Sequence, residues 1–478
     1  MTTLGLSRMV ASGALVMGLS GTLALGAEKE AESPFVRVKA GLVALQHVKL
    51  VDGTGAAPRE NQTIVIEKGK ITRIGSEDPP QGATVVDLTG FTALPGLVGM
   101  HDHMYYPAPG AMPLYPEHAS SFPVLYLAGG VTTLRTTGSV EPYADLALKG
   151  RIDAGSLVGP KIHVTGPYFE GQGAYTLQMY ELKDVEDARR TATYWLDEGV
   201  TSFKAYMHIT SAELAAIVAV AHARHVKVTG HLCSLGFREA AALGIDDLEH
   251  GLVVDTEFFS GKKPGECPEK GVIQEMAEKL NIQDAPVQAM IHDLVARHVA
   301  VTSTLPVFET LVPNRPPIRD GVIAAMTPAA QASYLEIRAR IADGAAKSVW
   351  PVLLKKEMEF EREFVKAGGL LLAGLDPTGY GGVVAGFGDQ REVELLVEAG
   401  FTPLEAIKIA TQNGAQFLGE EATIGTLAAG KAADIVIVKG DPATTIADIE
   451  KVDLVFKDGV GYDSAKLIAS VKGTVGLE

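Results

Sequence analysis

The sequence predicts an α/β protein: a (β/α)8 TIM barrel with a small β-sandwich domain built from both terminal segments. Eight short apolar runs alternate with amphipathic stretches of helical length between residues 97 and 376. Strand-like segments separated by Gly, Pro and Asp turns lie before and after this region. Polar residues able to bind metal end several of the apolar runs, and TIM barrels place their active sites at those strand ends. The alternation alone also fits a doubly wound open sheet, so the polar residues decide between the two architectures.

The expected domain boundaries follow from the strand-like segments near the two ends of the chain. The predicted strands are 42–50, 63–67, 70–75 and 84–87 in the N-terminal part, and 434–438 and 454–457 in the C-terminal part. We therefore expect residues 27–95 and 420–478 to pair into the small β domain. Residues 96–419 are then left for the barrel.

The eight predicted barrel strands are 97–103, 131–136, 161–165, 202–206, 226–231, 247–250, 300–304 and 370–376. Helices are expected between them, for example over 185–197, 212–225 and 288–298. Thr210 and Glu213 form a capping box at the start of the second of these helices. Two long connections, 252–286 and 305–367, are expected to cover the active site or to make contacts between subunits.

The composition is that of a globular protein and limits the partners. The 478 residues include 42 Lys and Arg against 58 Asp and Glu, a net charge of −16, and 46% are hydrophobic. The acidic total without a Lys/Arg run argues against nucleic acid and against an anionic membrane surface. Two cysteines, Cys233 and Cys267, exclude a cysteine-rich zinc module, and whether they pair stays open.

Residues 1–26 have the pattern of a signal peptide. Arg8 precedes the uncharged, mostly apolar run 9–25, and 24–26 offers small residues for cleavage. A retained membrane anchor is the alternative, but a run of 17 residues is short for a membrane span. We expect a periplasmic or secreted protein with no membrane attachment after cleavage. Cys233 and Cys267 could pair in such an oxidising compartment.

His101-Asp102-His103 is the most informative motif. Residues i and i+2 of a strand point to the same face, so both imidazoles face the barrel interior and Asp102 faces away. Two imidazoles placed in this way on a rigid strand can bind one metal ion.

Four further polar residues fall where a barrel needs them. Lys204 lies in the fourth predicted strand, and His231, His250 and Asp376 end the fifth, sixth and eighth. Each has a structural explanation when taken singly: a core histidine, a helix cap, or a lysine paired with a buried carboxylate. Taken together with His101 and His103, they favour a metal centre.

These residues and three segments resemble the amidohydrolase superfamily of metal-dependent hydrolases. The segments that carry the resemblance are 93–103, 129–135 and 424–436. Within the superfamily, the chain is similar to the branch of secreted Xaa-Pro dipeptidases and imidazolonepropionase-like enzymes. It departs from the common pattern at Gly99, where an Asp is frequent, and in the loop 166–173, which lacks the histidine of many dipeptidases.

The resemblance implies two divalent metal ions, with zinc expected, bridged by a carboxylated Lys204. His101, His103 and Asp376 would hold one ion, and His231 and His250 the other. Asp376 would also be the catalytic proton carrier for attack by metal-bound hydroxide. With an unmodified Lys204, a one-metal site is the alternative.

The expected function is export followed by cleavage of an amide C–N bond in a small molecule such as a dipeptide or an N-acyl amino acid. Lactone, carbamate and phosphotriester hydrolysis stay open because the same hydroxide serves all of them. A non-catalytic barrel and an exported solute-binding protein are the non-enzymatic alternatives.

Four residues are candidates for substrate binding. By alternation, Tyr206 shares the inward face with Lys204 and could bond a carbonyl or simply line the barrel. His163 and His208 could meet a substrate carboxylate or be structural. Arg135 could bind an anion or form an ion pair behind the site. Self-association through 305–367 is a further expectation.

Overall fold

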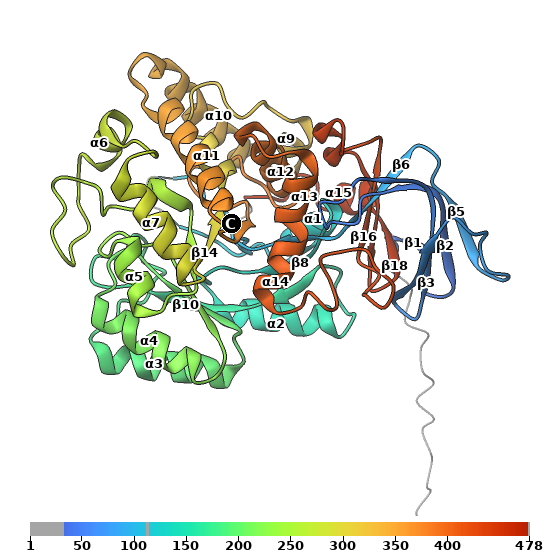
Figure 1. Ribbon diagram of the computed structural model, residues 1–478, viewed down its shortest axis with the longest axis horizontal. Helices are drawn as coiled ribbons and strands as arrows, with labels where there is room; N and C mark the ends of the chain where they lie inside the picture. The colour runs from blue at the N-terminus through green and yellow to red at the C-terminus, as the bar shows by residue number, and fades with distance from the viewer. Residues whose placement is uncertain (1–32, 111–113, 477–478) are drawn as a thin grey trace, which may run out of the picture. The chain divides into compact units, whose positions relative to one another are not determined.

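The computed structural model of the chain describes residues 33–110 and 114–476 (Figure 1). The predicted signal peptide, residues 1–26, lies outside the described residues.

Strands from the two ends of the chain form one sheet. β16 (Ile435–Lys439) pairs antiparallel with β6 (Phe91–Pro95), with Ile437 opposite Ala93, and the N-terminal blue and C-terminal red strands run side by side in Figure 1. Within the described residues this sheet has nine strands, in the order β1-β18-β17-β16-β6-β2-β3-β4 with β5 on β2. The remaining bounds are β1 (Val36–Val38), β2 (Val43–Leu50), β3 (Arg59–Glu67), β4 (Lys70–Gly75), β5 (Thr84–Asp87), β17 (Val452–Lys457) and β18 (Val460–Asp463). The expected pairing of the two ends is present, whereas the sandwich form of the domain stays a prediction.

Both faces of this sheet are buried at β16. Ile435 and Ile437 pack into the apolar core of the terminal strands, while Val436 and Val438 pack into the larger core of the α/β region. The alternation of side chains along a strand sends these neighbours to opposite faces. An uninterrupted Ile/Val run therefore joins the two parts of the molecule.

The remaining strands form two parallel sheets. One contains β7 (Leu97–Gly99), β8 (Val131–Arg135) and β9 (Lys161–His163). The other contains β10 (Thr165–Phe169), β11 (Ser202–Ala205), β12 (Lys227–Gly230), β13 (Asp247–Glu249), β14 (Ala300–Ser303) and β15 (Leu371–Ala373). All eight predicted barrel strands are present, with shorter bounds.

The strand β10 was not predicted. Residues 166–173 are a loop in the sequence-based prediction, and Gly166 and Pro167 are indeed poor strand formers. The structure instead continues as a strand to Phe169, with Tyr168 opposite Lys204 of β11. The third predicted strand is therefore two short strands that interrupt the ladder.

The two parallel sheets meet at their edges. The amide of Met100, after β7, donates to Ala373 O of β15 at 2.8 Å. At the other edge the amide of Thr165 donates to Thr136 Oγ1 at 3.1 Å. Parallel strands alternating with helices are consistent with the TIM-barrel fold, and closure into one continuous barrel stays a prediction.

Helices follow most of the parallel strands. Their bounds are α1 (Phe122–Ala128), α2 (Pro142–Asp153), α3 (Val185–Glu198), α4 (Ser211–His222), α5 (Phe237–Leu243), α6 (Val272–Lys279), α7 (Ala285–Ala296), α8 (Leu305–Glu309), α9 (Asp320–Ala325), α10 (Pro328–Asp343), α11 (Trp350–Lys366), α12 (Phe387–Ala399), α13 (Pro403–Lys408), α14 (Gly414–Leu418) and α15 (Ser464–Ser470). The predicted capping box is present at α4, where the amide of Glu213 donates to Thr210 Oγ1 and Glu213 Oε2 accepts from the amide of Thr210. No helix in the described part of the chain is both long and apolar enough to cross a membrane.

The two long connections contain helices of their own. Residues 252–286 carry α6, and Cys267 in this segment forms a disulfide with Cys233. The pairing that the sequence left open is thus present, with Cα atoms 4.9 Å apart. Residues 305–367 carry α8 to α11.

Candidate metal centre

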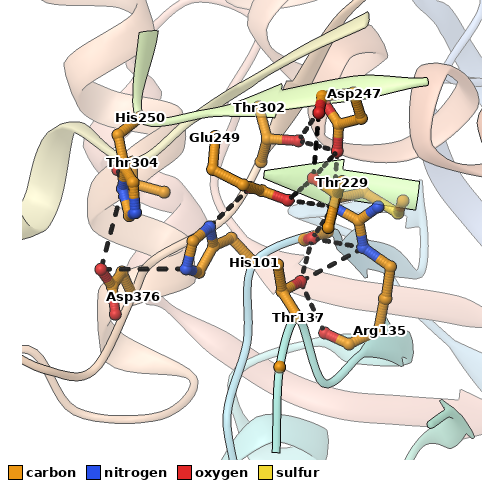
Figure 2. A network of polar contacts seen from close by, with 12 residues as sticks. His101, Arg135, Thr137, Thr229, Asp247, Glu249, His250, Thr302, Thr304 and Asp376 are labelled. Carbon is orange, nitrogen blue, oxygen red and sulfur yellow. Dashed lines mark hydrogen bonds and ion pairs between the residues drawn. The ribbon is translucent and has the colours of Figure 1, made fainter. Parts of the chain in front are cut away.

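The six predicted metal ligands lie at or just past the C-terminal ends of the parallel strands. His101 and His103 follow β7, and Lys204 is in β11. His231 follows β12, His250 follows β13, and Asp376 follows β15. All are buried except His231, which is half-buried. Figure 2 shows His101 between Glu249 and Asp376, with His250 beside them.

His101, His103 and Asp376 form a compact group that could hold a metal ion. Their potential ligand atoms all lie within 4.8 Å of one another. His101 Nε2 is 3.8 Å from Asp376 Oδ2, and His103 Nε2 is 3.7 Å from Asp376 Oδ1. An ion bound at about 2.0–2.2 Å from each ligand atom fits between atoms separated in this way.

The two imidazoles are held in the orientation that a metal requires. His103 Nδ1 is 3.0 Å from Gly138 O, and because a carbonyl only accepts, Nδ1 carries the hydrogen. His101 Nδ1 is 2.6 Å from Glu249 Oε2. Each Nε2 therefore presents its lone pair toward Asp376, as in metal sites whose histidines bond to a carbonyl or carboxylate behind them.

The electrostatics suit a cation. Burial lowers the pKa of both His101 and His103 well below the ordinary value, so both rings are neutral ligands. Asp376 Oδ1 is buried and has no hydrogen-bond donor among the described residues. A buried acceptor of this kind, 3.7 Å from His103 Nε2, fits a metal ion.

His231, His250 and Lys204 lie next to this group. The ring centroids of His101 and His250 are 4.5 Å apart, as are those of His250 and His231. Burial, with the nearby Lys204 charge, lowers the pKa of His231 to about 3. Burial also lowers the pKa of Lys204 to about 8, so a larger share of free amine is present at neutral pH than for an exposed lysine.

Two of the six predicted metal ligands have strained backbones. His250 has φ 68° and Asp376 has φ 50°, in the left-handed region that residues other than glycine rarely adopt. Such conformations cost about 1–3 kcal/mol and are concentrated at functional sites. Both side chains lie beside His101, and His250 Nδ1 lies 3.8 Å from Asp376 Oδ2.

Arg135 lies behind the histidines. Its guanidinium is 1% exposed and donates to Asp247 at 2.7 Å, to Glu249 at 2.9 Å and to Met100 O at 2.6 Å (Figure 2). This geometry matches the ion-pair alternative and does not bring Arg135 to the metal-facing side of His101. Arg135 therefore holds Glu249, which in turn holds His101.

The structure places the other three predicted substrate residues at different distances from the metal group. The Tyr206 ring lies beside the metal group, 5.0 Å from that of His231. His208 is farther along the same segment, with Nδ1 3.4 Å from Glu170 Oε2. His163 points to Glu420, 3.3 Å away, and the structure does not bring it to the metal group.

Sequence reasoning missed Glu249 as a partner of His101. Alternation puts Glu249 and His250 on opposite faces of a strand, so only one was expected to point inward. The left-handed φ of His250 breaks the alternation, and both residues face the interior. The signal available in the sequence was a charged residue inside an apolar run: Glu249 lies in such a run, as Lys204 does on its own strand.

A tyrosine cluster lies beside the metal group, and Tyr206 is the member that the sequence predicted as a substrate residue. The Tyr105 ring stacks on His103 at 4.4 Å, and its hydroxyl bonds to that of Tyr168. Tyr115 and Tyr206 extend the cluster, with ring centroids 5.4 Å from Tyr105 and 4.9 Å from Tyr168. Tyr105, Tyr115 and Tyr168 come from loops and from the unpredicted β10, so no regular spacing marks them in the sequence.

The chain shares sequence with known proteins over parts of its length. Residues 374–461 match the family described as the amidohydrolase family. A dihydroorotase from Streptomyces coelicolor is 28% identical over 163 residues, which is 30% of this chain and 38% of the relative. An imidazolonepropionase from Kosmotoga olearia is 34% identical over 123 residues, which is 25% of this chain and 29% of the relative. The matches thus span well under half the length of these curated relatives.

The likeness to solved structures extends over most of the chain. A protein from Bifidobacterium longum provisionally assigned as a prolidase has a TM-score of 0.64 and 25% identity, covering 91% of this chain and 99% of that one. A Xaa-Pro dipeptidase with bound methionine has a TM-score of 0.66 at 21% identity, with 88% and 100% covered. Ochratoxinase from A. niger has a TM-score of 0.60 at 19% identity, with 88% and 95% covered, and these last two likenesses concern the fold.

The family match and these structural relatives agree with the geometry of the site. The family match over residues 374–461 and the likeness to solved structures support membership of the amidohydrolase superfamily. Members of this superfamily usually bind a divalent metal ion, and His101, His103 and Asp376 are the candidate site.

Proposed function

We propose that this protein is an exported metal-dependent amidohydrolase that cleaves a C–N bond in a small molecule such as a dipeptide or an N-acyl amino acid. The observation that carries the proposal is the approach of two neutral imidazole Nε2 atoms to the buried carboxylate of Asp376, His101 to Oδ2 and His103 to Oδ1, with Oδ1 unpartnered among the described residues. The superfamily relatives named above support a hydrolase that acts on C–N bonds.

The proposal includes two divalent ions, with zinc favoured. His101, His103 and Asp376 would hold one ion, His231 and His250 would hold the other, and a carboxylated Lys204 would supply oxygen donors to both. The free amine of Lys204 adds to CO2 and loses a proton, which gives an anionic carbamate with two donor oxygens. The lowered pKa of Lys204 supports this step because it raises the share of free amine. When bound, such ions lower the pKa of a coordinated water to about 7 and polarise the scissile carbonyl.

Asp376 is the proposed proton carrier. Burial raises its pKa to about 6, close to the range in which a carboxylate both accepts and returns a proton. As water oxygen bonds to the amide carbon, Asp376 accepts the water proton. It then donates this proton to the amide nitrogen as the C–N bond breaks, which releases an amine and a carboxylic acid, and the acid passes its remaining proton to water or to the amine.

The surrounding residues orient the substrate and the ligands. We assign Tyr206 to bonding the substrate carbonyl, since its ring lies beside His231. His208 remains a candidate for a substrate carboxylate, and His163 a weaker one because it faces Glu420. Arg135 is a positioning residue that acts on His101 through Glu249.

The same proposal includes the closure of the barrel, the form of the small β domain and the compartment of the protein. We infer one closed eight-stranded barrel over 96–419 and a β sandwich from 27–95 and 420–478. Removal of residues 1–26 would release the protein to the periplasm or the exterior, and the disulfide between Cys233 and Cys267 supports an oxidising compartment. The partners expected are a small-molecule substrate and further copies of the chain, and neither nucleic acid nor a membrane.

Metal content per chain, measured on the purified mature protein, tests the proposal. About two ions per chain in the wild type, and fewer in Lys204→Ala, are expected. Lys227→Ala is the matched control, because Lys227 lies on the neighbouring strand and bonds to Phe417 O. The metal-loaded protein is then assayed on dipeptides and N-acyl amino acids, with lactones, carbamates and phosphotriesters as the alternatives. Protein that binds no added zinc would overturn the metal-dependent mechanism.

A further inference from the structure

A large cavity lies next to the metal centre. It is open to solvent, and its volume with that open solvent included is about 660 Å³. Its walls come from the loops that follow β7, β10 and β15, and from α10. These loops leave the same ends of the parallel strands that carry the metal ligands, which is where α/β proteins bind their substrates.

The lining of this cavity is aromatic and uncharged. None of the described residues that line it carries a charged side chain. The main side chains are Tyr106, Pro107, Tyr115, Tyr175, Ile337 and Tyr380. Such a lining disfavours a charged group, which loses hydration there without gaining a partner. Aromatic rings and alkyl chains gain there from leaving water, and the tyrosine hydroxyls and loop backbone of the lining add polar surface for uncharged hydrogen-bonding groups.

One wall is a single face of α10. Ala330, Ser333 and Ile337 line the cavity, and the spacing of three and four residues places them on one side of the helix. Leu335 lies on the same helix outside the lining and is 39% exposed. Ile337 on the cavity face and Leu335 on the exposed face are therefore two comparable apolar side chains of the same helix.

The cavity is one aromatic layer away from the metal group. Tyr115 lines it and lies 5.4 Å, ring to ring, from Tyr105, which stacks on His103 at 4.4 Å. On another side, Gly379 and Tyr380 line it within four residues of Asp376. The loops that line the cavity thus also carry Asp376 and the tyrosines that pack against His103.

Hydrogen bonds hold the walls in place. Gly382 N donates to Tyr106 Oη at 2.8 Å, and Tyr380 Oη donates to Thr310 O. Gln178 makes two bonds to the backbone of Tyr115, accepting from its amide at 2.6 Å and donating to its carbonyl at 3.0 Å. A preformed cavity loses little free energy to ordering when it binds.

We propose that this cavity binds a large uncharged substituent of the substrate. The preferred substrates are then amides that carry an aromatic ring or a long alkyl chain beside the scissile bond, rather than small or acidic amides. This inference rests on the proposed function and deepens it by naming the substrate class.

Two series of N-acyl amino acids test this inference with the zinc-loaded protein. The first holds the amino acid constant and compares acetyl, hexanoyl, benzoyl and succinyl groups. The second holds the acyl group constant and compares Gly, Leu, Phe and Asp. We expect kcat/KM for the aromatic or long-chain member to exceed that of the smallest member at least about tenfold in one series, since a single methylene in an apolar pocket is worth about 10–200-fold. The acidic member should be the poorest.

Variants of α10 connect the preference to the cavity. Ile337→Trp, which fills the space, and Ile337→Asp, which adds a charge, should each lower kcat/KM for the aromatic substrate at least about tenfold and leave the acetyl or glycine substrate within about twofold. Leu335→Asp is the matched control on the exposed face and should change neither. Equal rates for large and small substrates in both series, or equal losses on both in the Ile337 variants, would overturn the inference while amide hydrolysis stands.

A binding measurement separates this inference from the proposed function. Calorimetry with 4-phenylbutanol, which has no scissile bond and no charge, should detect binding to the wild type and to Leu335→Asp, and weaker binding to Ile337→Asp. This pattern in a protein that cleaves no amide would refute the proposed function and keep the cavity assignment. Absence of binding to the wild type would refute the cavity assignment.

Discussion

His101 and Glu249 form a buried contact of 2.6 Å between Nδ1 and Oε2, which joins the metal-facing imidazole to a charged network behind it. Glu249 also accepts from Arg135 at 2.9 Å and from Thr229 Oγ1. The carboxylate is fully buried, so its charge is offset chiefly by the Arg135 guanidinium, which is 1% exposed. The orientation of His101 thus depends on Glu249 and, through Glu249, on Arg135, which lies behind the histidines.

Glu249→Gln should weaken metal binding at this site. The amide keeps the shape of the side chain but loses the charge that makes His101 a stronger donor and that balances Arg135. Loss of a comparable partner behind a metal ligand lowers metal affinity about 10–100-fold. Titration of zinc against a competing chelator measures this change.

Glu392→Gln is the control for that substitution. Glu392 is also a buried carboxylate, 1% exposed, but it lies on α12 and contacts none of the metal-group histidines in the part of the chain described here. It should leave zinc affinity unchanged. An unaltered affinity in Glu249→Gln would show that the contact does not support the metal site.

Reduction of the disulfide should destabilise the protein. Cys233 and Cys267 close a loop with a sequence separation of 34 residues that carries part of the connection after β13. A crosslink over a loop of this kind contributes about 2–4 kcal/mol. Wild-type protein should therefore unfold at a lower temperature with a thiol reductant present than without it.

Cys267→Ser separates the crosslink from other effects of the reductant. The variant should unfold at the lower temperature in both conditions, with no further shift when reductant is added. A wild-type protein whose thermal unfolding does not respond to complete reduction would contradict the prediction.

Strand alternation predicted much of the metal centre from the sequence. It placed His101 and His103 on one face, and Lys204 in a strand beside them, because these residues sit within regular apolar runs. It failed at His250, where a left-handed φ of 68° turns the chain and brings Glu249 inward as well. Backbone strain of this kind is imposed by tertiary packing, and a single sequence carries no periodic signal for it.

The cavity beside the metal group could not be predicted from the sequence either, because tertiary structure brings its walls together. Tyr115, Tyr175 and Tyr380 come from three loops that are far apart along the chain. Their meeting depends on the order of the strands and on loop conformation. The Ile337 face of α10 shows a helical spacing, but only the fold reveals what that face covers.

Buried carboxyl groups between the strands and α11 and α12 should make the protein less stable at alkaline pH. Burial raises the pKa of Glu361 to about 8 and holds that of Glu392 well above its ordinary value, with mutual repulsion adding to the effect. The folded state therefore keeps protons that the unfolded chain releases above about pH 4.5. The free energy of unfolding falls as pH rises from about 4.5 through about 8.

Glu361→Gln should flatten this dependence. The amide cannot ionise, so the variant should gain at least about 1 kcal/mol relative to wild type between pH 5 and pH 9, since one pKa unit is worth about 1.4 kcal/mol. Urea unfolding at both pH values, with the same metal content, measures the difference. A constant offset between the two proteins at all pH values would show that Glu361 does not keep its proton in the folded state.

Gly99 and Asp102 explain one departure from the superfamily pattern and give the last prediction. A Cβ at position 99 would lie 1.9 Å from Asp102 Oδ2, so the fully buried Asp102 carboxylate fills the space that a side chain at 99 would need. Gly99→Ala should cost about 1–3 kcal/mol through this overlap. Gly99→Asp should cost more, because it also brings a second carboxylate against one whose pKa burial already raises.

The partner substitution should reverse the effect. Asp102→Ala in the Gly99→Ala background removes the overlapping oxygen, so the double variant should be more stable than Gly99→Ala alone, which a thermal unfolding cycle of the two single variants and the double variant measures. Gly150→Ala is the control for the same chemical change, because nothing lies within 4 Å of a Cβ built at position 150 within α2. It should stabilise the helix by about 0.5–1 kcal/mol, since alanine loses less backbone freedom than glycine on folding. If Asp102→Ala brought no recovery, the exclusion of larger residues at 99 would have to arise elsewhere, and the carboxylate of Asp102 would not be a substitute for one at position 99.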